Sequence, residues 1–279
     1  GYLNLTQGYN AATNSASSFS GLSIVSTLAW GLGYFGMPHI LLRFMAAEEA
    51  DKLSVSRRIA TVWVVISMFI AVFIGIIGYS VSAAGKLPFL TTSSDAETII
   101  IRLSSLMSHY GLLLAIAAGV ILSGILAATM STSDSQLLAA ASSVSQDLLQ
   151  DFFRIQLTPK GTMLAARGTV VAIALVGVFL AWDPNSSVFR VVSFAWAGFG
   201  ASFGPLMLFS LFWKRANKWG ALAGMVTGSV MVFVWKYLIA PMGGAWAIYE
   251  LLPAFLCACV AIVAVSLLTP APDRDVIET

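Results

Sequence analysis

Seven runs of about 20 or more apolar residues alternate with short polar stretches along the chain. Because an α-helix rises about 1.5 Å per residue, roughly 20 apolar residues cross the 30 Å hydrocarbon core of a bilayer. The sequence therefore predicts seven membrane-spanning helices, near residues 21–43, 59–84, 110–132, 163–182, 187–213, 219–240 and 246–269.

Two segments depart from this simple alternation. Residues 95–107 carry apolar side chains at helical spacing opposite Asp95 and Arg102, which is typical of a short helix lying in the membrane interface. The third apolar run continues past Thr132 as an amphipathic stretch that reaches Asp147. We therefore predict an interfacial helix near 95–107, followed by one long, tilted helix.

The composition favours a lipid-embedded protein. The chain is 58% hydrophobic and only 10% charged, whereas soluble domains carry about 25% charged residues. This argues against a soluble enzyme, and no P-loop, nucleophile elbow or dinucleotide-binding pattern indicates catalysis or an organic cofactor. The net charge of +2 is spread over the loops, which gives no support for a nucleic-acid partner. Cys257 and Cys259 are interpreted as packing residues, and His39 and His109 lack partners at metal-ligand spacing.

The basic residues indicate which ends face the cytoplasm. Of the 15 Lys and Arg residues, eleven follow the odd-numbered spans and four lie on the opposite side. Since cytoplasmic loops are enriched in Lys and Arg, we expect residues 1–20 to form an extracellular or periplasmic loop and residues 270–279 a cytoplasmic tail of a cell-membrane protein. The sequence starts inside a polar stretch without a signal peptide, so we also expect it to be the later part of a longer protein.

The first span contains three glycines and a proline near its middle, in the run Trp-Gly-Leu-Gly-Tyr-Phe-Gly-Met-Pro-His at residues 30–39. Pro38 cannot donate a helical hydrogen bond, and each glycine costs about 1 kcal/mol of helix propensity. A broken helix is therefore predicted, which in transporters is where substrate and ion sites lie. A packing kink is the alternative. Trp30 and Tyr34, one turn apart, line a substrate cavity or belong to an interfacial aromatic belt.

The third span carries a stripe of oxygen atoms. Ala128, Ser131, Thr132 and Ser135 share one helical face. Neutral hydroxyls and carbonyls suit a hard cation such as sodium, with further ligands supplied by another segment. The alternative is that the hydroxyls bond to their own helix or to neighbouring helices. Asp134 lies just beyond the hydroxyl pair, where it either attracts and releases a cation or is solvated.

Glycines recur in the fifth and sixth spans. In residues 196–205, glycines and Pro205 predict another interrupted helix. Gly220, Gly224 and Gly228 recur every four residues, which favours close helix contact rather than ligand binding.

The run from Trp30 to Met45, which continues as Ile-Leu-Leu-Arg-Phe-Met, resembles the signature of the sodium:solute symporter family, and most closely that of its sodium/proline symporters. Four further runs resemble family segments in the same order and extend the resemblance over nearly the whole chain: residues 125–132, 145–148, 193–200 and 220–225. One position departs from the sodium/proline symporters, because Met37 stands where they carry Gln.

The resemblance implies an all-α polytopic membrane protein with the leucine-transporter architecture, in which two inverted five-helix repeats cross at a central site. Residues 21–213 would form the second repeat and residues 214–269 two additional C-terminal spans, while the first repeat would be absent. It further implies a sodium half-site made by the carbonyl of Ala128 and the hydroxyls of Ser131 and Thr132. Substrate-cavity positions are Trp30, Tyr34 and Pro38, and the expected gating positions are Gly33, Gly36, Arg43 and Asp134.

These observations together predict a sodium-coupled symporter that imports a small zwitterionic solute by alternating access. Proline is the first choice of substrate, sodium is the coupling ion, and the lipid bilayer is the surroundings. Two alternatives stay open: a membrane sensor built on a symporter-like domain, and a transporter fragment that is inactive by itself.

Overall fold

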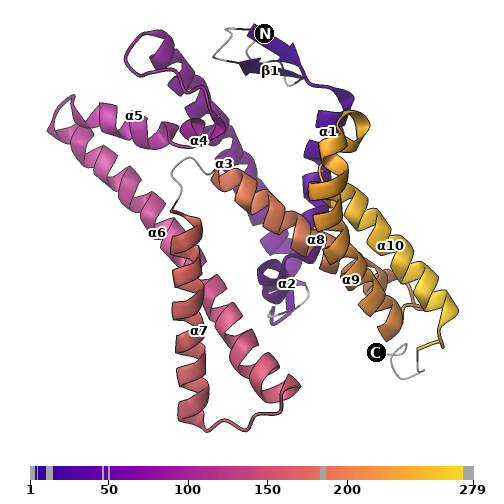
Figure 1. The fold of residues 1–279 in the computed structure, drawn as a ribbon. Helices are drawn as coiled ribbons and strands as arrows, with labels where there is room; N and C mark the ends of the chain where they lie inside the picture. The colour runs from indigo at the N-terminus through magenta and orange to yellow at the C-terminus, as the bar shows by residue number, and fades with distance from the viewer. Residues whose placement is uncertain are drawn as a thin grey trace. The chain divides into compact units, whose positions relative to one another are not determined.

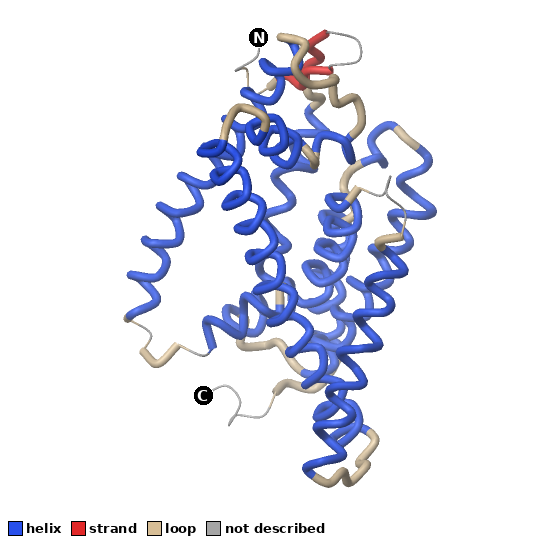
Figure 2. The backbone as a smooth tube through the Cα atoms, turned by 90° about the vertical axis from the view of Figure 1, so that its left-hand side faces the viewer, coloured by secondary structure: helices blue, strands red, loops and turns tan. Residues whose placement is uncertain are grey.

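The computed structural model describes residue 4 and residues 6–10, 15–45, 47–49, 51–182 and 187–272. Most of this chain is helical (Figure 2). It divides into two compact units, Gly1–Ile59 with Val188–Thr279, and Ala60–Ser187.

The first unit begins with a polar hairpin and contains the first span and the last three. Strands β1 (Gln7–Asn10) and β2 (Ser15–Ser18) pair antiparallel, with Gln7 opposite Ser18. The later elements are α1 (Gly21–Ala29), the 3-10 helix η1 (Trp30–Gly36), α2 (Pro38–Met45), the start of α3 (Lys52–Ala83), α8 (Val188–Phe212), α9 (Lys218–Val234), the π-helical η3 (Trp235–Ile239), the short η4 (Ala240–Met242) and η5 (Gly244–Ala247), and α10 (Leu251–Leu268).

The second unit contains most of α3 and the elements α4 (Ser93–Ala96), α5 (Ile99–Ser108), α6 (Leu112–Ser142), the π-helical η2 (Ser143–Phe152) and α7 (Pro159–Leu180). Helix α5 therefore covers most of the helix predicted near 95–107, and the third span continues without a break through Asp147, as predicted. In Figure 1, α6 and α7 form an antiparallel hairpin joined through η2.

Six helices among the described residues are long and apolar enough to cross a membrane. The first predicted span is the exception, because it is divided into α1, η1 and α2. The seven predicted spans are thus present as six long helices and one broken segment, and the chain is an all-α polytopic membrane protein apart from the hairpin. That hairpin was missed because Asn, Ser and Ala give no alternating apolar pattern.

The helices of the first unit pack closely because glycines remove side chains from their contact faces. A Cβ atom on Gly220 would overlap the Ser266 side chain, one on Gly224 would overlap Ile262, and one on Gly228 would overlap the Ala201 carbonyl. The predicted close contacts of the sixth span are therefore confirmed, with α10 and α8 as the neighbours, and Figure 1 shows α9 beside α10.

The fifth span is not interrupted, so that prediction was wrong. Helix α8 runs continuously through Pro205, which is buried. The glycines serve contact rather than a break: a Cβ on Gly204 would lie 2.7 Å from the Phe255 ring, and one on Gly200 would lie 2.6 Å from the Cα of Gly33. Burial against α10 and η1 stabilises the helix enough to offset the hydrogen bond that Pro205 removes.

Candidate functional site

The first span is broken where the sequence predicts it. Helix α1 ends at Ala29, η1 continues to Gly36, and Met37 adopts an extended conformation with φ −81° and ψ 111°. Helix α2 starts at Pro38, a first-turn position that tolerates the missing N–H. The Met37 carbonyl accepts hydrogen bonds from the backbone N–H groups of Ile40 and Leu41, both at 3.0 Å. One continuous hydrogen-bond ladder is thus replaced by two.

The broken segment has a packed face and an open face. Gly33, Gly36 and Met37 are buried, whereas Tyr34 is 53% exposed and Pro38 is also exposed. Met37, the position that departs from the sodium/proline symporters, is 3% exposed and lies on the packed face. An apolar side chain at this position is therefore accommodated by protein packing.

Helix α8 supplies the surface against which the segment packs. A Cβ on Gly33 would overlap the Trp196 indole, and one on Gly36 would overlap the Phe199 carbonyl. The two glycines that sequence analysis assigned to gating thus lie at the closest approach of η1 to α8. Any larger residue there would push the two elements apart.

Aromatic rings surround Trp30 at the junction of α1 and η1. The ring centroid of Trp30 lies 5.3 Å from that of Phe189, 5.5 Å from that of Trp196 and 5.9 Å from that of Tyr249, with near-parallel planes in all three pairs. Tyr34 meets Trp196 edge to face at 4.8 Å. Trp30 is therefore half-buried among rings from α8 and from the segment that precedes α10.

Sequence analysis did not assign a role to Phe189, Trp196 or Tyr249. Trp196 lies in the run 193–200, which the family resemblance had marked without naming a function. Tyr249 belongs to no periodic pattern, and its phenol donates a hydrogen bond to the Ser193 carbonyl at 2.6 Å.

The oxygen stripe of α6 lies in the second unit and is exposed. The Thr132 hydroxyl donates to the Ala128 carbonyl at 3.1 Å. The Ser135 hydroxyl bonds to the carbonyls of Ser131 and Thr132, each at 3.0 Å. Within residues 51–182, which the structure describes without a gap, the Ser131 hydroxyl has no hydrogen-bond partner.

This geometry is compatible with a cation. Oxygens 3.1 Å apart, as in Thr132 and Ala128, can both contact one small ion, because a hard cation such as Ca²⁺ holds oxygen ligands at about 2.3–2.6 Å. The Thr132 hydroxyl can rotate its proton away to free a lone pair. Asp134 is exposed one turn away. The side chain of Arg43, the remaining predicted gating residue, lies outside the described residues.

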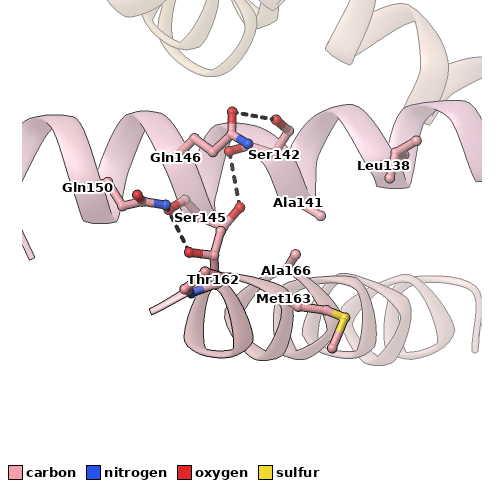
Figure 3. Close-up of a pocket in the computed structure, with 10 residues that line it drawn as sticks. Leu138, Ala141, Ser142, Ser145, Gln146, Gln150, Thr162, Met163 and Ala166 are labelled. Atoms are coloured by element: carbon pink, nitrogen blue, oxygen red, sulfur yellow. Dashed lines mark hydrogen bonds between the residues drawn. The ribbon is translucent and has the colours of Figure 1, made fainter. Parts of the chain in front are cut away.

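A pocket of about 510 Å³, lined by apolar and uncharged polar residues in equal number, lies farther along the same helix, between α6 with η2 and α7 (Figure 3). None of its lining residues is charged. The Gln150 amide donates to the Thr162 hydroxyl at 3.2 Å and to the Ser145 carbonyl at 3.1 Å. The bond to Thr162 ties η2 to α7. Ser145 and Gln146 lie in the run 145–148 that resembles a family segment, but the sequence pattern did not predict a pocket there. Among the described residues no cluster of His, Cys, Asp or Glu is suited to a metal ion.

Comparison with known proteins identifies the family. Residues 5–228 match the model of the sodium:solute symporter family. The chain is 40% identical to the sodium/proline symporter of Haemophilus influenzae over 267 residues, 96% of this chain and 52% of that protein. It is 42% identical to the high-affinity proline transporter PutP of Bacillus subtilis over 255 residues, 91% of this chain and 51% of that protein. With the sodium/proline symporter of Escherichia coli it shares 39% identity over 252 residues, 90% of this chain and 48% of that protein.

The chain spans about half the length of the curated relatives it matches. No solved structure matches it. The family model covers most of the chain, and the broken helix and the oxygen stripe both lie within the matched residues. This match shows that the chain belongs to the sodium:solute symporter family.

Proposed function

We propose that the natural protein containing this chain is a sodium-coupled symporter that imports proline across the cell membrane by alternating access. The observation that carries the proposal is the break between Gly36 and Pro38 in an apolar segment. Interrupted helices at membrane depth are tolerated where they are covered by protein or line a wet cavity, and they hold substrates in transporters. The relatives named above, all proline transporters, supply the identity of the substrate.

The open face of the broken segment is the proposed substrate surface. Tyr34 and Pro38 are exposed and Trp30 is half-buried, and aromatic faces suit the apolar ring of proline. Gly33 and Gly36 in the same segment permit the close approach to α8. Arg43 is proposed to act near the cytoplasmic end of the same segment.

The oxygen stripe is the proposed sodium half-site. Ala128, Ser131 and Thr132 supply three neutral oxygens, and the remaining ligands come from outside this stripe. Entry of sodium provides the driving force, since one charge moving through a potential of 100 mV is worth about 2.3 kcal/mol. Asp134 is proposed to assist release of the ion toward the cytoplasm.

The proposed architecture follows from the same family. Residues 21–213 form one five-span inverted repeat and residues 214–269 two further spans. Residues 1–20 face the outside and residues 270–279 the cytoplasm, because basic residues are concentrated in the loops that this orientation places inside.

The test compares two threonines on one helix. Thr132→Val removes a hydroxyl of the proposed half-site, whereas Thr129→Val removes a hydroxyl that also bonds to its own helix, to the Ile125 carbonyl at 2.9 Å, but lies off the stripe. Both changes keep the side-chain shape. We expect Thr132→Val to raise the sodium concentration for half-maximal proline uptake at least about tenfold, roughly 1.4 kcal/mol, and Thr129→Val to leave it unchanged.

The uptake assay uses the complete natural protein in cells that lack their own proline transport. An unchanged sodium dependence in Thr132→Val would remove the half-site assignment. Absence of sodium-driven uptake and of counter-flow of labelled proline in the unmodified protein would overturn the transport function itself.

A further inference from the structure

We propose that Trp196 is a positioning residue for the substrate face of the broken helix, supported by Tyr249 from the segment that precedes α10. The proposal rests on the transport function proposed above. It adds two residues that neither the sequence pattern nor the family model assigns, and Tyr249 lies beyond the matched residues 5–228.

Trp196 is bound to the broken segment by its polar edge. Its indole N–H donates to the Trp30 carbonyl at 3.0 Å, where α1 passes into η1. The same indole edge occupies the space that a side chain at Gly33 would need. The carbonyl at this helix junction is part-buried, and this bond supplies a partner from another helix.

The ring of Trp196 also contacts the two aromatic residues proposed to meet the substrate. It stacks on Trp30 with the planes 15° apart and meets Tyr34 edge to face at 82°. Both geometries are favoured for aromatic pairs. Because the Trp196 ring contacts both Trp30 and Tyr34, one side chain fixes the orientation of both.

Tyr249 contacts the same group of aromatic rings from the segment that precedes α10. Its ring stacks on Trp30, its phenol donates to the Ser193 carbonyl, and its backbone N–H donates to the Ser26 hydroxyl at 3.1 Å. One residue therefore links α1 and α8 while contacting Trp30. We define Trp30, Phe189, Trp196 and Tyr249 as the aromatic clamp.

The clamp sets the affinity for substrate rather than the rate of turnover. A surface that is held in its binding conformation loses less entropy when the ligand arrives, so its affinity is higher. When the clamp is weakened, a smaller fraction of the molecules holds Trp30 and Tyr34 in the orientation that binds substrate. The apparent KM then rises in inverse proportion to that fraction.

The experiment uses graded variants and a matched control in the complete natural protein. Trp196→Phe keeps a ring and removes the N–H donor, Trp196→Leu removes both, and Tyr249→Phe removes only the phenol. The control is Trp235→Phe, because the Trp235 indole donates to the Trp246 carbonyl at 3.2 Å in the same unit, and neither residue belongs to the clamp.

We expect the KM for proline to rise about fivefold in Trp196→Phe, about 30-fold in Trp196→Leu and about threefold in Tyr249→Phe, as expected for the loss of single hydrogen bonds and an aromatic pair. Maximal uptake per molecule at the cell surface stays within about twofold of the unmodified protein, and Trp235→Phe leaves KM unchanged. A fall in maximal uptake with unchanged KM, or an equal KM rise in the control, would overturn the positioning role.

A second readout does not depend on transport. In a background with Cys257 and Cys259 replaced by alanine, Gly31→Cys places a thiol in the broken segment at a position with open space around it. We expect Trp196→Phe to speed maleimide labelling of this thiol about fivefold, the same factor as for KM. If the unmodified protein shows no proline uptake, the proposed function fails. The labelling rate then tests the positioning role of Trp196 by itself. Faster labelling in Trp196→Phe supports that role, and an unchanged rate overturns it.

Discussion

The two candidate regions of this chain differ in how they are packed. The broken first span lies against α8 and α10, and 33% of the most apolar stretch of each of those helices is buried. The oxygen stripe lies on α6, where only 6% of the corresponding stretch is buried, and α3 and α7 have none buried. The proposed substrate surface is therefore supported by its own unit, whereas the proposed sodium half-site is an exposed face of a helix.

The difference follows from which residues cover each helix. Contact faces in the first unit carry glycine, alanine and serine, which allow backbones to approach closely, beside larger side chains such as Leu251 and Phe255. Helix α3 instead exposes large apolar side chains such as Trp63, Phe69 and Phe73. Such surfaces are covered by lipid or by other protein segments. The packed region should therefore respond to substitution through stability, and the open region through ion affinity.

The largest effect is expected for Gly36→Ala. An added Cβ would lie 2.8 Å from the backbone nitrogen of Gly204 and 2.9 Å from the Cα of Gly200. Because these neighbours are backbone atoms, α8 must move, and we expect a loss of about 3 kcal/mol of stability. The measurement is the thermal midpoint of the protein in detergent.

Gly31→Ala is the matched control for this substitution. It lies in the same segment, with no atom within 4 Å of an added Cβ, so its midpoint should stay level or rise slightly. If both variants lose stability equally, the contrast between the packed and open faces of the segment is wrong.

The second effect concerns an ion pair in the packed unit. The Lys236 ammonium lies 2.9 Å from a carboxylate oxygen of Glu250 and 4.9 Å from the centre of the Phe194 ring. The Glu250 side chain is only 10% exposed, so removing the cation leaves a poorly solvated charge. Lys236→Met should cost about 2 kcal/mol, less than a fully buried pair would.

The double variant Lys236→Met with Glu250→Gln tests the cause of that loss. It should recover most of the stability lost in Lys236→Met, because no unpaired charge remains. Thermal midpoints of the unmodified protein, the two single variants and the double variant form a double-mutant cycle. Additive losses would show that the pair does not couple.

The sequence predicted the parts of this fold that depend on composition and spacing. Long apolar runs predicted the spans, because length and hydrophobicity alone define a membrane helix. Pro38 with three glycines predicted the break, since the missing N–H acts locally. Gly220, Gly224 and Gly228 predicted close packing for the same local reason.

The features that were missed depend on tertiary contacts. Pro205 has the same chemistry as Pro38, yet α8 continues through it because α10 and η1 pack along the helix. Tyr249 enters the aromatic clamp only because α10 brings it beside Trp30. Local signals do not say which neighbour will be present, so neither outcome was predictable from residue types.

A smaller effect is expected on the open face of α6. Ser131→Ala removes one proposed sodium ligand that is exposed and has no hydrogen bond within residues 51–182. We expect the sodium concentration for half-maximal uptake to rise about fivefold and the thermal midpoint to stay unchanged. Ser133→Ala, on the same helix but off the stripe, is the control. A shifted midpoint in Ser131→Ala would show that the face is packed after all.

The smallest effect is expected for Asp134→Asn. This carboxylate is exposed, and exposed charges contribute at most about 1 kcal/mol to an interaction. We expect the sodium affinity to fall about twofold at low ionic strength and the change to vanish when choline chloride is added, because a Debye length of about 10 Å at 0.1 M screens the charge. Asp147→Asn, 13 residues and about 20 Å farther along the helix, should have no effect at either ionic strength. A tenfold change that added salt does not reduce would mean that Asp134 contacts the ion away from water, and the face of α6 would then be a covered site rather than an open one.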